Sequence, residues 1–167
     1  HAGELLQLKV QDVGLLVVAV GLSQIVSSPF WGRMADSTSK HVMLRSVQIA
    51  GGAVCLALLL AILPSRTFQY LGYLVVFLLI GLAEAGVRLG RKTYLVDATP
   101  VEERATYTAF SNSLIGLLAI LSGLAGLVAQ WFGSNVMLLA IALIMLVGIY
   151  VCRRMPEADL MLDAANQ

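Results

Sequence analysis

Long apolar stretches separated by short polar ones dominate this chain of 167 residues. A helix needs about 20 apolar residues to cross the hydrocarbon core of a bilayer. Stretches of that length are expected at residues 13–31, 42–63, 68–97, 105–130 and 135–152. The pattern therefore predicts an all-α membrane protein whose single transmembrane domain, residues 1–167, holds five transmembrane helices.

The third stretch, residues 68–97, carries charged side chains before its apolar character ends. Glu84, Arg88, Arg91 and Lys92 are three or four residues apart, so on one helix they share a face. An ionised side chain at bilayer depth costs roughly 2.5 to 3.5 kcal/mol, which disfavours a lipid-facing stripe. We therefore expect this face to meet a protein interior or a watery cavity, with Glu84, Arg88 and Arg91 as candidates for substrate binding or coupling.

Simpler structural interpretations of the same charges stay open. Glu84 and Arg88 have the favourable i, i+4 order and can neutralise each other as a static ion pair. Arg91 and Lys92 lie near one end of the stretch, where their long side chains can reach the interface.

The composition supports a membrane protein and argues against other classes. Hydrophobic residues make up 59% of the chain and charged residues 13%, against about 25% charged in soluble domains. The mean hydropathy is +0.85. A net charge of +1 gives no indication of nucleic-acid binding. Because the chain begins with His1 rather than methionine, we expect it to be a fragment of a larger protein.

Enzyme and metal chemistry find little support in the sequence. Both histidines, His1 and His41, lie outside the apolar stretches, so no intramembrane histidine can serve a serine–histidine pair. Cys55 and Cys152 sit in apolar runs without metal-ligand spacing and are typical of packing or lipid-facing positions. We therefore expect no enzymatic activity, no cofactor and no metal.

The distribution of basic residues predicts the orientation. The side that holds residues 32–41, residues 98–104 and the C-terminus carries eight Lys and Arg residues, whereas the other side shows only Lys9 and Arg66. Cytoplasmic loops carry the excess of basic residues in membrane proteins. We therefore expect a cytoplasmic C-terminus, with residue 1 outside.

Two stretches have faces of small residues at helical spacing, which let another helix approach closely in a membrane. In residues 13–31 this face is small and polar, and it comprises Gly14, Gly21, Gln24 and Ser28. In residues 105–130 the candidate packing residues are Gly116, Ala119, Gly123 and Gly126.

The segment GRMADSTSKHVMLR resembles the cytoplasmic loop motif of major facilitator superfamily (MFS) transporters. That motif has a glycine, three residues, an aspartate, a base, any residue, a glycine and two bases. Gly32, Asp36, Lys40 and His41 match it, whereas serines replace the first base and the second glycine. Farther along, Asp97, Pro100 and Arg104 match the acid, proline and base of a later cytoplasmic turn in the family.

The resemblance implies gating roles for the polar residues of these two loops. In the resulting hypothesis, Asp36 meets a helix end or a base such as Arg104, and this contact holds the cytoplasmic side shut. The candidate gate residues are Gly32, Asp36, Lys40, Arg45, Asp97 and Arg104.

The resemblance also implies a place in a larger architecture. The five stretches look like helices eight to twelve of a twelve-helix transporter, with helix seven and the amino-terminal half missing. Helix ten, here residues 68–97, would line the central cavity, and the stretches at 42–63 and 135–152 would face lipid. A register as helices two to six of an amino-terminal half has similar logic and stays open, although the end of the chain soon after Arg154 favours the carboxyl-terminal half.

The function implied is secondary active transport of a small solute by alternating access. The partners would be the lipid bilayer, the solute and the missing helices, in a bacterial inner membrane. Glu84 is hypothesised to couple protons and Arg88 to tune it or to bind an anionic substrate group. The competing interpretation is a non-transporting multi-helix membrane subunit, such as an assembly or receptor partner.

Overall fold

The computed structural model describes residues 10–62 and 66–158, without the side chains of 10–12, 66–67, 124–129 and 134. The regular structure in the described residues is helical, and each helix contains a segment long and apolar enough to cross a membrane. The all-α fold with five membrane-length helices is therefore confirmed. The helices are α2 (Val10–Ala35), α3 (Ser39–Leu60), α4 (Arg66–Asp97), α5 (Arg104–Phe132) and α6 (Ser134–Arg154).

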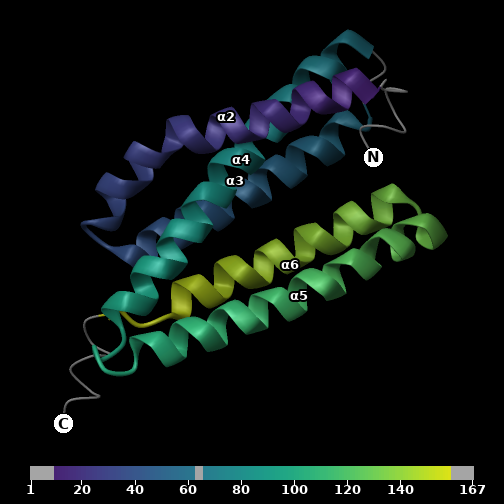
Figure 1. The fold of residues 1–167 in the computed structure, drawn as a ribbon. Coiled ribbons are helices and arrows are strands. Elements are labelled where there is room, and N and C mark those ends of the chain that lie inside the picture. Colours follow the sequence, from purple (N-terminus) through teal and green to yellow (C-terminus); the bar gives the residue numbers. More distant parts are fainter. Residues whose placement is uncertain (1–9, 63–65, 159–167) are drawn as a thin grey trace.

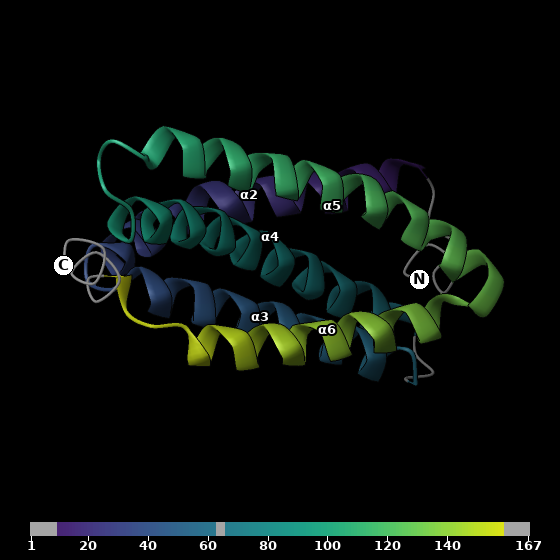
Figure 2. The same cartoon turned by 90° about the horizontal axis from the view of Figure 1, so that it is seen from below.

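The helices run up and down, with successive helices antiparallel (Figures 1 and 2). Helix α4 packs against both α2 and α3, and α6 lies along α3. Helices α5 and α6 form a hairpin whose turn holds Gly133 at φ 84°, a left-handed conformation that glycine adopts without strain. The α2–α3 loop, the α4–α5 loop and the end of α6 lie at one end of the molecule, which we call the basic end.

Helix α2 is longer than the apolar stretch that predicts it. It continues to Ala35, and Pro29 lies inside it. Gly32 does not end the helix, and the N–H of Asp36 still bonds its carbonyl at 3.1 Å. The loop is therefore residues 36–38 alone, because α3 already begins at Ser39.

Glycines of α4 explain why α2 and α3 approach it so closely. A Cβ atom at Gly81 would lie 2.5 Å from the carbonyl oxygen of Val20 in α2. One at Gly86 would overlap the hydroxyl of Ser46 in α3 and lie 2.7 Å from the Trp31 indole in α2. Small residues at a helix interface allow this separation in membrane proteins.

Polar side chains of α2 fasten it to the backbone of α4. Trp31 is completely buried, and its indole N–H donates to the carbonyl of Leu82 at 2.9 Å. One turn away on α4, the carbonyl of Leu78 accepts a bond of 2.6 Å from the hydroxyl of Ser23. The buried indole N–H requires such a partner, and the two bonds together fix the register of α2 against α4.

The apolar core lies between α3 and α4, away from the basic end. Its buried residues are Ala53, Ala57, Leu60, Tyr73 and Val76. Helix α5 differs sharply from this pair, since none of its membrane-length segment Arg104–Gly123 is buried within the chain. The charged middle of α4 is thus held by α2 and α3, while α5 leaves most of its surface open.

Candidate functional site

A three-residue polar cluster joins α2 to the middle of α4. The side-chain amide of Gln24 donates to Glu84 Oε2 at 2.9 Å, and its oxygen accepts from Arg88 Nη2 at 2.8 Å. Glu84 and Arg88 themselves are 3.9 Å apart, N to O. The amide therefore bridges the two charged groups, and each makes a shorter contact with Gln24 than with the other.

This cluster is partly open although it lies within a membrane-length segment. The side chains of Glu84 and Arg88 are 56% and 51% exposed. Glu84 lies 13 residues before the end of α4 at Asp97, which corresponds to roughly 20 Å along a helix. Charges at that depth and exposure require a watery or protein surface opposite them, because lipid would not solvate them.

Arg91 turns to a different neighbour. Its Nη1 donates to Ser111 Oγ at 3.1 Å and lies 3.5 Å from Asn112 Oδ1, both on α5. Arg91 and Lys92 line a cavity of about 310 Å³ between α4 and α5. Lys92 and Arg88 line a second cavity of about 230 Å³ on the side of α2. The basic residues Arg88, Arg91 and Lys92 of α4 thus line two cavities, and Lys92 lies between the two.

Several of the candidate gate residues gather at the basic end. Asp36 and Asp97 line one cavity of about 560 Å³ together with Glu157, which follows α6. Lys40 forms an ion pair with Glu157 at 3.3 Å. Gly32 lies in the last turn of α2 and Arg45 is exposed on α3.

Arg104 is the first residue of α5, and its Nε donates to the carbonyl of Thr99 in the preceding loop at 3.3 Å. Among the described residues no ion pair joins Arg104 to Asp36. The structure therefore places Asp36, Asp97 and Lys40 close together, and Lys40 pairs with Glu157.

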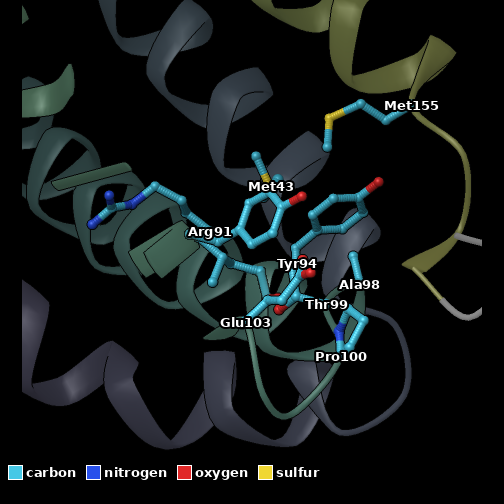
Figure 3. Close-up of a pocket in the computed structure, with 10 residues that line it drawn as sticks. Met43, Arg91, Tyr94, Ala98, Thr99, Pro100, Glu103 and Met155 are labelled. Carbon is cyan, nitrogen blue, oxygen red and sulfur yellow. The ribbon is translucent and has the colours of Figure 1, made fainter. Parts of the chain in front are cut away.

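A pocket of about 540 Å³ with mainly apolar walls lies beside this group, among the same helix ends (Figure 3). Met43, Tyr94 and Met155 line it, and the Tyr94 hydroxyl donates to the carbonyl of Pro156 at 3.1 Å. Arg91 contributes its stem, while its guanidinium lies at the edge of the view, away from Met43 and Met155 (Figure 3).

The expected packing face of α5 contacts no other helix at the positions the structure describes. A Cβ atom at Gly116 or Gly123 would meet nothing within 4 Å, and Ala119 is exposed. Gly126 lies outside the described side chains. A partner for this face would have to come from outside the described residues.

Sequence reasoning missed several important residues. The sequence predicts only that Gln24 lies on a polar face, because its position between two charges depends on the register of α2 against α4. Glu157 and Tyr94 were not identified, because nothing in the sequence places the segment after α6 beneath α3 and α4. The glycines of α4 carried a usable signal, since Gly86 and Gly90 have the small-xxx-small spacing of close helix pairs.

Comparison with known proteins gives the family. Residues 1–163 match the model of the Major Facilitator Superfamily. The Quinolone resistance protein NorA of Staphylococcus aureus, in strains MRSA252 and Mu50, is 29% identical over 124 residues. That match covers 71% of this chain but only 29% of NorA, so the chain spans less than a third of the relative's length. No solved structure matches the chain. With its membrane-length helices and intramembrane charges, the chain belongs to the Major Facilitator Superfamily of membrane transporters.

Proposed function

We propose that this chain is part of a proton-coupled secondary transporter that moves a small solute by alternating access. The observation that carries the proposal is the bridge from Glu84 through Gln24 to Arg88. It places a carboxylate and a guanidinium at membrane depth, on a face of α2 and α4 that stays half open. In transporters of this kind the solute and the coupling ion bind near the midplane, between two repeats.

The bridge can link protonation to a change of partners. With Glu84 ionised, the amide donates to the carboxylate and accepts from Arg88. A protonated Glu84 becomes a donor, and it then competes with Arg88 for the oxygen of Gln24. Loss of that acceptor frees one donor of Arg88 for a solute. Proton uptake at Glu84 would therefore alter how Arg88 meets the solute.

Further features support the proposed setting. Six of the eleven Lys and Arg residues lie at or near the basic end, and this excess supports its assignment to the cytoplasm: Arg33, Lys40, Arg45, Arg104, Arg153 and Arg154. Similarity to bacterial proteins supports a bacterial plasma membrane. We further propose that the chain forms helices eight to twelve and that helix seven and an amino-terminal half complete the transporter. The name of its relatives makes a quinolone the first solute to test.

The decisive experiment replaces the coupling carboxylate in the complete transporter, reconstituted in liposomes. Glu84→Gln keeps the size of the side chain and removes its charge change. We expect transport driven by a pH gradient to fall to background, while exchange of labelled solute without a gradient persists. Glu102→Gln, an exposed loop carboxylate, is the matched control and should leave both activities unchanged. Gradient-driven uptake that survives Glu84→Gln would show that Glu84 has a structural role.

A further inference from the structure

We propose that the two cavities flanking Lys92 form a binding site for an organic anion, a carboxylate or phosphate carried on an apolar body. As the site of the transported solute, this inference rests on the proposed function. The residues that line the two cavities include three cations, Arg88, Arg91 and Lys92, and no carboxylate. The face of α4 between α2 and α5 is therefore strongly basic.

The charge of these cations is only partly balanced within the chain. Arg88 has Glu84 beside it at 3.9 Å. Within residues 10–62 and 66–158, neither Arg91 nor Lys92 forms an ion pair. Both lie inside the membrane-length segment Phe68–Asp97, where unbalanced charge is costly. A bound anion would balance them.

Arg91 is positioned to bind such an anion. Both of its hydrogen bonds to α5 start from Nη1, and they go to the neutral oxygens of Ser111 and Asn112. Among the described residues no hydrogen bond uses its Nε or Nη2, the two donors of one edge of the guanidinium. Such an edge fits two oxygens of a carboxylate or phosphate at once. The contacts to α5 would hold the side chain ready for that geometry.

The other lining residues define the rest of the ligand. The cavity between α4 and α5 is also lined by Leu95, Val96 and Thr108. The cavity beside α2 contains Ala85 and Leu89. These apolar walls suit an aryl or alkyl body, and Thr108 offers a further donor to the charged group. A phospholipid headgroup and a soluble organic anion share this chemistry.

The Glu103 carboxylate does not form an ion pair with the Arg91 guanidinium. Both residues line the pocket of about 540 Å³ at the basic end (Figure 3). They form no ion pair, and the Arg91 guanidinium is engaged with α5 instead. The pocket that contains Glu103 shares Arg91 and Leu95 with the cavity between α4 and α5, but the Arg91 guanidinium bonds to the α5 residues that line that cavity.

The test measures binding rather than transport, in the complete transporter purified in a neutral detergent. The probes are naphthalene-2-carboxylate and its neutral analogue naphthalene-2-carboxamide, titrated by calorimetry. We expect the carboxylate to bind at least about tenfold more tightly, since hydrogen bonds to charged groups contribute roughly 1.5 to 3 kcal/mol. Equal affinity for the two probes would overturn the proposal.

Two pairs of variants locate the site. Asn112→Asp places a carboxylate beside Arg91 with almost no change of shape, and it should weaken naphthalene-2-carboxylate by about tenfold or more. Asn135→Asp, an exposed position at the start of α6, should not. Likewise Lys92→Gln should weaken binding, whereas Arg33→Gln, an exposed base on α2, should not. Effects no larger than those of the controls would place the anion elsewhere and overturn the proposal.

A displacement experiment with lipids identifies whether the anion is a lipid headgroup or a soluble molecule. In nanodiscs, displacement of naphthalene-2-carboxylate by phosphatidylglycerol but not phosphatidylcholine would support the site and assign it to a lipid headgroup. Binding that is insensitive to phosphatidylglycerol would support it as the site of a soluble anion. Because these measurements need no gradient, carboxylate binding would persist even if Glu84→Gln left transport unchanged, and the two proposals can fail separately.

Discussion

The ammonium group of Lys40 lies 3.3 Å from the carboxylate of Glu157. Lys40 is in the first turn of α3, and Glu157 follows the end of α6, so the pair links two segments far apart in sequence. The Tyr94 hydroxyl bonds the carbonyl of Pro156, and Ala158 is only 7% exposed. The segment after α6 is therefore fastened across the ends of α3 and α4.

We predict a modest but measurable coupling between Lys40 and Glu157. Their side chains are 18% and 43% exposed, and exposed or partly exposed ion pairs contribute about 0.2 to 1 kcal/mol. A double-mutant cycle of Lys40→Gln and Glu157→Gln, measured by chemical unfolding of the complete transporter, should give a coupling in that range. The coupling should shrink at high salt. A cycle of Lys92→Gln with Glu157→Gln is the control, and equal values in both cycles would contradict the pairing.

Gly86 should be far less tolerant of a side chain than Gly52 on α3. A Cβ atom there overlaps Ser46 and lies 2.7 Å from Trp31, which is buried. Gly86→Ala should therefore lower the free energy of unfolding by about 1 to 3 kcal/mol, as overpacking does. Gly52→Ala, where a Cβ meets nothing within 4 Å, should be neutral or stabilising by up to about 1 kcal/mol. Similar unfolding midpoints for the two variants would show that α2 and α3 do not approach α4 this closely.

Much of the fold follows from the sequence because it depends on local properties. Apolar length alone gives the membrane-crossing elements, and their bounds in the structure differ by a few residues at the ends. The clearest difference is at Pro29, which interrupts one backbone hydrogen bond without ending α2. Helical bonding resumes beyond it and continues to Asp36, whose N–H still bonds the carbonyl of Gly32. Periodicity of apolar residues says nothing about such a continuation.

The site is less predictable because its contacts depend on tertiary packing. The shared face of Glu84 and Arg88 follows from helical spacing, and so does their proximity. Placement of Gln24 between them requires α2 to approach α4, which the glycines of α4 allow. Arg91 bonds to α5 and not to this cluster, although it lies only three residues beyond Arg88. Sequence spacing predicts which residues share a face, but not which neighbouring helix each side chain reaches.

The open face of α5 should prove essential in the complete transporter. Among the described residues a Cβ atom at Gly123 meets nothing within 4 Å, which fits a surface that receives a helix from the proposed remainder of the transporter. Gly123→Leu should then disrupt assembly or transport strongly, because a large side chain blocks close helix approach. Gly52→Leu is the control, since Gly52 is also open but lies on α3, a helix expected to face lipid. Equal and small effects on transport would place the Gly123 face against lipid as well.

The orientation can be tested by cysteine labelling in intact cells. Ser37 is exposed in the α2–α3 loop and Asn135 is exposed beside the α5–α6 turn, whereas Ser39 is buried and unsuitable. With Cys55 and Cys152 replaced, an impermeant maleimide added outside should label Asn135→Cys and not Ser37→Cys. Permeabilised cells should show labelling at both positions. Labelling of Ser37→Cys alone in intact cells would reverse the proposed topology.

Gln24 should be required for gradient-driven transport, because its amide contacts both charged groups of the cluster. Gln24→Met preserves the length of the side chain and removes both hydrogen bonds. Without the amide the two charged groups are no longer bridged, so transport driven by a pH gradient should fall strongly while exchange of labelled solute without a gradient persists. Gln48→Met on α3, whose amide makes no hydrogen bond among the described residues, is the matched control and should leave both activities unchanged. Equal loss of both activities in Gln24→Met would reduce Gln24 to a packing residue and remove the amide from the coupling mechanism.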